Sequence, residues 1–228
     1  MNNQFEIAGR LSVLKSDGYI DRASSDLKSY FLQGTYVGKT TLIKALVFGG
    51  TEKTYQSWNG IDSETIQNDP TFNSAGIFTD EFGNTQFYDN ETDNYQQDHY
   101  QLHWNEKLSN KWSTNVGLNY TYGRGYYEQY KEGEDFADYD LTPIIIGGET
   151  INETNLIRRR WLDNDFYVLN ANATYKNSEL EFILGTSLSN YKGDHFGEII
   201  WAEYASNSQI RDHYYESESK KNDVNIFG

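Results

Sequence analysis

Apolar and polar side chains alternate along the segment Trp112–Arg124. One set of alternate positions is aliphatic in the middle and aromatic at both ends, whereas the other set is small and polar. A period of two predicts a β-strand with two unlike faces. The first set is Trp112, Thr114, Val116, Leu118, Tyr120 and Tyr122, and the second is Ser113, Asn115, Gly117, Asn119, Thr121 and Gly123.

The length of this segment indicates what its apolar set faces. Trp112 and Tyr122 are ten residues apart. At ~3.3 Å per residue and a tilt near 45°, that distance covers about 23 Å of membrane normal. The apolar band of an outer-membrane barrel is about 25 Å tall and carries an aromatic girdle at each interface. The pattern therefore favours a strand that crosses a bilayer over a strand of a soluble sandwich, which has no reason to carry aromatic residues at both tips.

The same alternation recurs along the chain and predicts eight strands. Short polar turns or long polar loops separate them, and the last strand starts after Tyr214. The other expected strands cover residues 5–13, 30–36, 40–55, 99–105, 112–124, 167–175 and 180–189.

The connections between these strands alternate in length. Tight turns are expected at 37–39, 108–111 and 176–178, and long loops at 56–94, 126–163 and 192–214, with an intermediate loop at 16–26. An antiparallel meander places alternate connections at opposite ends, so one end carries the short turns and the other the long loops. Transmembrane barrels have this asymmetry. We predict an all-β, antiparallel up-and-down meander of about eight long strands.

Composition narrows the functional class. The chain of 228 residues has 34 acidic and 19 basic side chains, a net charge of −15, and no cysteine. The charge argues against nucleic-acid binding, and the missing cysteine excludes disulfides and thiolate chemistry. A mean hydropathy of −0.78, without any apolar run of 18 residues, excludes a helical membrane protein. It is compatible with spanning strands, in which only alternate residues face lipid.

Two short motifs have ordinary structural explanations. The segment Gly34–Thr40 resembles a phosphate-binding loop but has three residues between its glycines instead of four, and a strand-like segment follows it, so we expect a hairpin turn. His99 and His103 have the spacing of a helical zinc pair. On a strand that spacing separates them by about 13 Å, too far for one zinc ion. We expect polar side chains lining a lumen together with Gln97 and Gln101, and no metal site or other cofactor.

The long loops contain the candidate binding residues. The loop 56–94 has no Lys, Arg or His; solvated surface charge is one interpretation of its carboxylates, and attraction of a cationic or metal-bearing ligand is the other. The run Arg158–Arg160 either balances the charges of Asp163 and Asp165 or contacts an anion, such as a ligand carboxylate or a lipid phosphate. The candidate ligand-binding residues in these loops are Trp58, Tyr126, Tyr127, Tyr130, Arg158, Arg159, Arg160 and Trp161.

The three tyrosines among them have two interpretations. They lie just past the expected outer girdle, so they either stack on a ligand in a vestibule or extend the girdle. No nucleophile elbow and no pairing of acids is visible in the sequence, so we do not expect an enzyme.

Two segments resemble a known family. The runs SDGYIDRASSDLKSYFLQGTYVGKTTLIKALVFGGTEKTYQSW (Ser16–Trp58) and DNYQQDHYQLHWNEKLSNKWSTNVGLNYTYGRGYYEQY (Asp93–Tyr130) resemble the barrel of TonB-dependent outer-membrane receptors of the Bacteroidetes type. The resemblance implies a transmembrane barrel of about 22 strands, plugged by an N-terminal domain, in the outer membrane of a Gram-negative bacterium. It also implies active import of a scarce ligand, driven by the TonB energy-transducing partner through the plug.

The start of the chain, MNNQFEIAGR, has no basic or apolar region of a signal peptide, and the C-terminus lies inside a strand-like segment. We therefore expect residues 1–228 to be a partial barrel domain, without plug, that forms an open sheet with two bare edges. The expected function of the parent protein is import of a ferric siderophore or related metal complex. The alternatives are an oligosaccharide importer of the starch-utilisation type and a soluble or surface-tethered β-rich glycan-binding module. Expected partners are outer-membrane lipid, lipopolysaccharide, the TonB partner and a small-molecule ligand.

Overall fold

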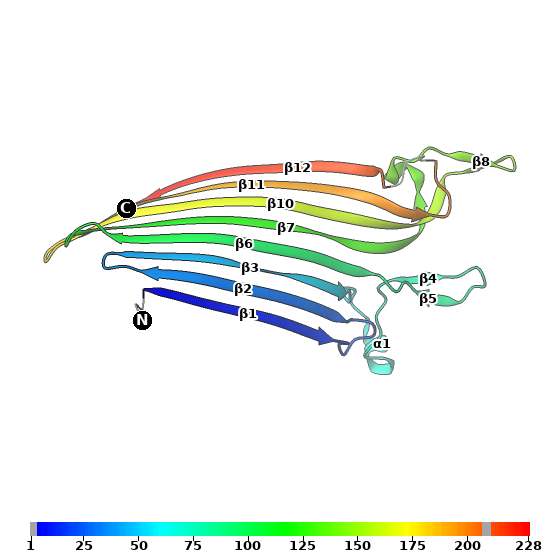
Figure 1. Ribbon diagram of the computed structural model, residues 1–228. Helices are drawn as coiled ribbons and strands as arrows, with labels where there is room; N and C mark the ends of the chain where they lie inside the picture. The colour runs from blue at the N-terminus through cyan, green and yellow to red at the C-terminus, as the bar shows by residue number, and fades with distance from the viewer. Residues whose placement is uncertain (1–3, 207–210) are drawn as a thin grey trace.

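The chain forms one large antiparallel sheet. The computed structural model describes residues 4–206 and 211–228. Its eight long strands follow one another in chain order, so every neighbour in the sheet is also the next long strand in the sequence (Figure 1). The predicted all-β meander is confirmed. The strands are β1 (Phe5–Ser16), β2 (Ser25–Val37), β3 (Thr41–Tyr55), β6 (Thr92–Lys107), β7 (Trp112–Asp135), β10 (Glu153–Lys176), β11 (Glu181–Ala202) and β12 (His213–Phe227).

The two ends of the sheet differ as the loop lengths predict. One end, the turn end, carries only tight turns, and both chain termini lie there; the other, the loop end, carries the small elements (Figure 1). No helix in the described residues is long and apolar enough to cross a membrane. The elements of the loop end are the helix α1 (Ser63–Asn68), the hairpin of β4 (Ile77–Thr79) and β5 (Thr85–Phe87), the 3-10 turn η1 (Phe136–Tyr139), and the hairpin of β8 (Ile144–Ile146) and β9 (Glu149–Ile151).

The strands are longer at the loop end than the sequence pattern predicts. Residues 126–135 and 153–163 belong to β7 and β10, and residues 192–202 belong to β11, although we expected all of them in loops. In these extensions both faces carry polar and aromatic side chains, so the alternation disappears while the backbone pairing continues. The seven candidate residues between Tyr126 and Trp161 therefore lie on strands, and only Trp58 lies in a loop.

One face of the sheet, here called the apolar face, has no charged side chain over three consecutive cross-strand rows, each of which takes one residue from every long strand. The middle row is aliphatic apart from one glycine, and aromatic side chains are concentrated in the two rows that flank it. The rows are Phe5, Tyr36, Ile43, Trp104, Val116, Ala171, Thr186 and Ile226; then Ile7, Gly34, Ala45, Leu102, Leu118, Leu169, Leu188 and Val224; then Gly9, Leu32, Val47, Tyr100, Tyr120, Tyr167, Asn190 and Asn222.

Within residues 4–206 and 211–228, no second layer covers the apolar face. Leu118 is 45% exposed, Phe182 49% and Leu184 53%. These side chains would be buried in a sandwich or in any other two-layer domain, because such folds place the apolar face of a sheet against another element. The arrangement leaves open a broad, contiguous apolar surface of the kind that marks an interaction site in a soluble protein.

The opposite face, here called the polar face, carries amides, hydroxyls and histidines at the same height, together with the charged Glu6 and Lys44 and the apolar Leu46 and Val168. His99 and His103 lie on it with Gln97 and Gln101, as expected: His99 bonds Thr121 at 2.9 Å and Gln97 at 3.2 Å. His103 bonds Gln101 at 3.2 Å. These contacts satisfy both ring nitrogens of His99 and the Nε2 atom of His103.

Two further expectations are confirmed. Gly34–Thr40 covers the end of β2 and the turn into β3, so it is a hairpin and not a phosphate-binding loop. The sheet is open, since β1 and β12 are its first and last strands and do not pair with each other. Its buried cluster lies at the loop end, where Phe136, Tyr139, Leu141 and Leu156 pack together.

Candidate functional site

Two arginines on neighbouring rows of the polar face form the centre of the candidate site. Arg158 pairs with Gln129 across β7 and β10, and Arg160 pairs with Tyr127. Because residues two apart on a strand point to the same side, both guanidinium groups lie on one face. The strand pairing thus places two cations side by side at the loop end of the sheet.

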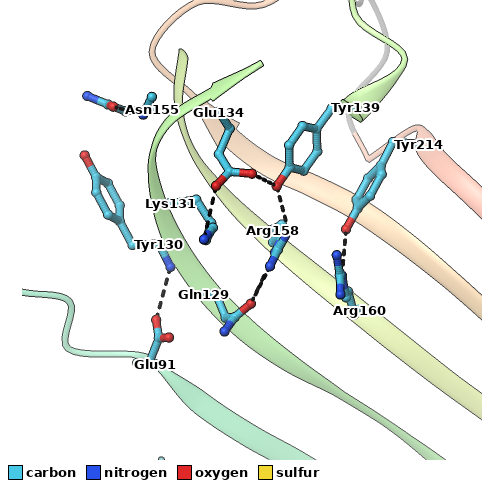
Figure 2. A network of polar contacts seen from close by, with 11 residues as sticks. Glu91, Gln129, Tyr130, Lys131, Glu134, Tyr139, Asn155, Arg158, Arg160 and Tyr214 are labelled. Atoms are coloured by element: carbon cyan, nitrogen blue, oxygen red, sulfur yellow. Dashed lines mark hydrogen bonds and ion pairs between the residues drawn. The ribbon is translucent and has the colours of Figure 1, made fainter. Parts of the chain in front are cut away.

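Arg158 is held by neutral groups. Its Nη2 and Nε atoms donate to Gln129 Oε1 at 2.8 Å and 3.2 Å, and its Nη1 atom donates to the Tyr139 hydroxyl at 2.7 Å. The Tyr139 hydroxyl in turn donates to Glu134, which also pairs with Lys131 at 3.1 Å (Figure 2). The turn η1 supplies Tyr139, so the loop after β7 fixes the orientation of the guanidinium.

Arg160 is held by two tyrosine hydroxyls. It donates from Nη1 to Tyr127 at 3.1 Å and from Nε to Tyr214 at 3.4 Å; Figure 2 shows the contact with Tyr214. The two hydroxyls accept these bonds, and in the described residues neither donates its own proton to another group. Each can therefore donate to an acidic ligand beside Arg160.

Neither guanidinium forms an ion pair with a carboxylate in the part of the chain that the structure describes, although the chain carries 34 acidic residues. Arg124 and Arg159, by contrast, pair with Asp163 and Glu128. Arg158 and Arg160 are therefore fixed in position without a direct carboxylate partner, although Glu134 and Glu91 are close enough to Arg158 for their charges to interact. This arrangement suits an anion that accepts from planar guanidinium groups.

The candidate residues from the sequence divide between the two faces. Trp58 packs edge-on against Tyr127, with ring centroids 5.7 Å apart, and so joins Arg158 and Arg160 on the polar side. The other four point to the opposite side of the sheet and do not belong to this cluster, because they occupy the intervening positions of β7 and β10. They are Tyr126, Tyr130, Arg159 and Trp161.

Arg159 has a structural partner on that opposite side. Its Nε lies 2.7 Å from an oxygen of Glu128, which is 2% exposed, and Tyr88 and Asn90 also donate to Glu128. The interpretation of the arginine run as charge balance is therefore right for Arg159, but its partner is Glu128 and not the expected Asp163 or Asp165. Asp163, which we expected to pair with the run, binds Arg124 at 3.3 Å.

The acidic loop 56–94 is only partly solvated. Glu91 is 5% exposed and accepts the Tyr130 backbone N–H at 3.2 Å (Figure 2). Burial raises the pKa of the Glu91 carboxyl above its ordinary value, although this bond and the nearby Lys131 and Arg158 act in the other direction. The interpretation of this loop as solvated charge is thus wrong for Glu91, which anchors the loop on β7.

Several residues that surround Arg158 and Arg160 could not be predicted from the sequence pattern. Gln129 and Glu134 fall in the stretch expected to be a loop, where no register was available to pair them. Tyr139 and Tyr214 are far apart in the sequence and meet only because η1 packs against the start of β12, with ring centroids 4.7 Å apart. The high tyrosine count, 19 of 228 residues, was the one available hint.

No protein-family model matches the chain, and a search of curated proteins gives no match. Within the described residues, no group of three or more His, Asp or Glu side chains is placed to hold a metal ion.

Proposed function

We propose that this chain is part of the barrel wall of a TonB-dependent outer-membrane receptor that imports a scarce ligand, a ferric siderophore or related metal complex. The observation that carries the proposal is the uncovered apolar face, whose three charge-free rows cross all eight strands. Such a face needs a solvent without water, and a sheet in that solvent must close on itself because backbone groups at a bare edge cannot be satisfied there.

The borders of the apolar face support a bilayer. At its border toward the loop end, Tyr120 lies in the last charge-free row and donates to Asp165 at 2.6 Å, so its ring lies in the apolar zone and its hydroxyl meets the first charged row. Tyr30 belongs to that charged row and donates to Asp98 of the same row at 2.7 Å. At its border toward the turn end, Trp112 packs against Tyr175, with ring centroids 5.1 Å apart. Rings with one apolar and one wet end are typical of membrane interfaces.

The two aromatic borders also favour a membrane protein over a soluble glycan-binding module. A soluble binder gathers its aromatic side chains in one cleft, whereas here they form rows at the two limits of an open face. Trp112 and Tyr120 are eight residues apart on one strand, which corresponds to about 26 Å along the strand.

The charge of the candidate site favours an anionic ligand. Arg158 and Arg160 present guanidinium groups and tyrosine hydroxyls on the face that would line the lumen, and Trp58 adds an aromatic surface. Ferric complexes of catecholates or hydroxycarboxylates carry net negative charge, so they fit this cluster. A neutral oligosaccharide would use the aromatic and amide groups but would gain little from two fixed cations.

Depth-resolved tryptophan quenching tests the membrane assignment. Single-tryptophan variants that keep either Trp112 or Trp58 would be refolded into vesicles with lipids brominated near the headgroup or at mid-chain. We expect Trp112 to be quenched most by bromine near the headgroup and Trp58 to be unaffected by either lipid. An unquenched Trp112 would overturn the proposal.

Ligand binding tests the ligand class. We expect an anionic ferric tris-catecholate to bind the refolded chain, and Arg158→Met or Arg160→Met to weaken binding about tenfold or more, the value of one charge-assisted contact. Arg124→Met, which removes the same charge from the other face, is the control. Equal binding by all these variants, or binding of a neutral oligosaccharide in place of the catecholate, would favour the oligosaccharide importer.

A further inference from the structure

The dipeptide Asn59–Gly60 lies in the segment that joins β3 to the helix α1, at the loop end of the sheet (Figure 1). It is the only asparagine–glycine pair in the sequence. Both residues are exposed, and neither belongs to a helix or strand. The residue directly before them is Trp58, which packs against Tyr127 in the candidate site. A chemical change at Asn59 therefore takes place beside that site.

The segment around this dipeptide is held at its two ends only. Before it, the Gln56 backbone N–H donates to the Glu91 carbonyl at 3.1 Å, and the Asn73 side chain donates to the Gln56 carbonyl at 2.8 Å. After it, Asp62 caps the first turn of α1. Between these anchors, residues 57–61 form no hydrogen bond within the part of the chain that the structure describes. No hydrogen bond therefore opposes rotation of the backbone at the dipeptide.

Two other asparagines that precede a small residue are restrained by contacts. Asn73 precedes a serine and is 3% exposed; its Nδ2 donates to two backbone carbonyls, and its Oδ1 accepts a backbone N–H. Asn177 also precedes a serine, and its Oδ1 accepts two backbone N–H groups, at 2.8 Å each, in the turn before β11. A further asparagine–serine pair, at 207–208, lies outside the described residues. The Asn59 side chain, by contrast, has no hydrogen-bond partner among residues 4–206 and 211–228.

We propose that Asn59 is a site of deamidation. The backbone nitrogen of Gly60 forms a bond to Asn59 Cγ, the bond from Cγ to Nδ2 breaks, and ammonia leaves with the amide proton of Gly60. Water then opens the resulting succinimide ring at either of its carbonyls, which gives aspartate or isoaspartate at position 59. Glycine favours the first step, because it has no Cβ to hinder the approach and its backbone adopts conformations that other residues avoid.

Either product adds a negative charge beside the candidate site. The ring of the neighbouring Trp58 lies 5.7 Å from that of Tyr127, and the Tyr127 hydroxyl lies 3.1 Å from Arg160 Nη1. Residues 56–94 contain no Lys, Arg or His that would balance the new charge. The consequence for binding rests on the proposed function: an anionic ligand at Arg160 is repelled by the carboxylate at position 59.

The repulsion is moderate and depends on salt. Through this chain of contacts the new carboxylate lies roughly 10–15 Å from Arg160, which is about one Debye length at 0.1 M salt. For a ligand with several negative charges, we expect the affinity to fall about two- to fivefold at low ionic strength and to change little at high salt.

Peptide mapping by tandem mass spectrometry tests the modification. The full chain, refolded in detergent micelles, would be incubated at mildly alkaline pH and sampled over time. We expect Asn59 to lose its amide before Asn73 and Asn177 do, and isoaspartate to form at position 59. The control is Gly60→Ala: a Cβ there meets nothing within 4 Å, so the substitution leaves the fold in place while it hinders the attacking nitrogen.

Gly60→Ala should slow the conversion of Asn59 to the pace of the restrained asparagines. Conversion of Asn59 no faster than that of Asn177 in the wild type would overturn the proposal. An unchanged rate in Gly60→Ala would overturn it as well, because the Gly60 nitrogen would then not be the attacking group.

Binding of the ferric tris-catecholate at low and high salt tests the consequence. Asn59→Asp reproduces the charge of the product, and Asn59→Gln keeps the side chain neutral. We expect only Asn59→Asp to bind more weakly, and only at low salt; equal affinity of the two variants refutes the effect on the ligand. Deamidation is measured without any ligand, so a wild type that converts at Asn59 but does not bind the complex refutes the proposed ligand class and not the modification site.

Discussion

Replacing Leu118 by arginine distinguishes a lipid-facing from a water-facing sheet by the size of its effect on stability. Leu118 occupies the middle of the three charge-free rows, between Leu102 and Leu169 on the neighbouring strands, and is 45% exposed. Its side chain meets no second layer, so the cost of a charge there depends almost entirely on the solvent outside.

The magnitude follows from that position. An arginine at the bilayer midplane of a barrel strand costs about 2–4 kcal/mol, and the cost falls to about 0–1 kcal/mol near the interfaces. We therefore expect Leu118→Arg to lower the free energy of unfolding in vesicles by about 2–4 kcal/mol. If the same face met water, replacing a half-exposed leucine would change stability by no more than about 0.5 kcal/mol.

The assay is urea unfolding of the chain in phospholipid vesicles, followed by tryptophan fluorescence. The matched control is Asn119→Arg, the adjacent residue on the polar face, which accepts from Gln101 at 3.0 Å and donates to Thr121 at 3.1 Å. Its loss of stability should be limited to these two hydrogen bonds, about 0.5–1.5 kcal/mol each at most.

A loss for Leu118→Arg no larger than that for Asn119→Arg would refute the reasoning, because the two faces would then be equivalent. A gain in stability for Leu118→Arg would refute it more directly, since only water makes that position favourable for a charge.

Three further predictions concern the loop end and the glycines. Burial raises the pKa of the Glu91 carboxyl above its ordinary value. A raised folded-state pKa contributes stability at acid pH that is lost as pH rises through it, so the wild type should lose unfolding free energy relative to Glu91→Gln from acid to neutral pH in urea titrations. Arg159→Met leaves the buried charge of Glu128 without its ion-pair partner and should lower the free energy of unfolding by about 3–5 kcal/mol. Adding Glu128→Gln should recover most of this loss in the same titration. Gly125→Ala would overlap a backbone carbonyl of β6, so we expect thermal melting to show a loss of about 1–3 kcal/mol, whereas Gly117→Ala, with only ordinary contacts, should be neutral or stabilising.

The sheet could be predicted from sequence wherever its two faces differ. The alternation from Trp112 to Tyr122 defined a strand, its start and its orientation. The tight turns predicted at 37–39, 108–111 and 176–178 overlap those of the structure at 38–40, 108–111 and 177–180. A period of two is visible only when alternate side chains meet unlike surroundings. The continuation of β7 from Tyr126 to Asp135 was therefore missed, because both of its faces carry polar and aromatic residues.

The candidate site could be predicted in part for the same reason. Arg158, Arg160, Tyr127 and Trp58 were selected by residue type, and the structure places them on the same face of the sheet. Their division from Arg159, Trp161, Tyr126 and Tyr130 needed the register of β7 against β10, which requires both segments to be recognised as strands. Tyr139 and Tyr214 could not be found, since a contact between distant loops leaves no local pattern.

The row at which the alternation stops has a physical meaning on the proposed function. At that row Tyr30 and Tyr120 bond Asp98 and Asp165, and beyond it charges occupy the outward positions of the sheet. Within hydrocarbon an outward side chain must be apolar, so the sequence is constrained there; in water it can be of either kind, so the constraint ends. The row at which the period-two pattern ends, and the strands can no longer be predicted from sequence, is then the row at which the strands leave the membrane. Beyond this row the side chains can form specific polar contacts, as Glu128 does in its buried ion pair with Arg159.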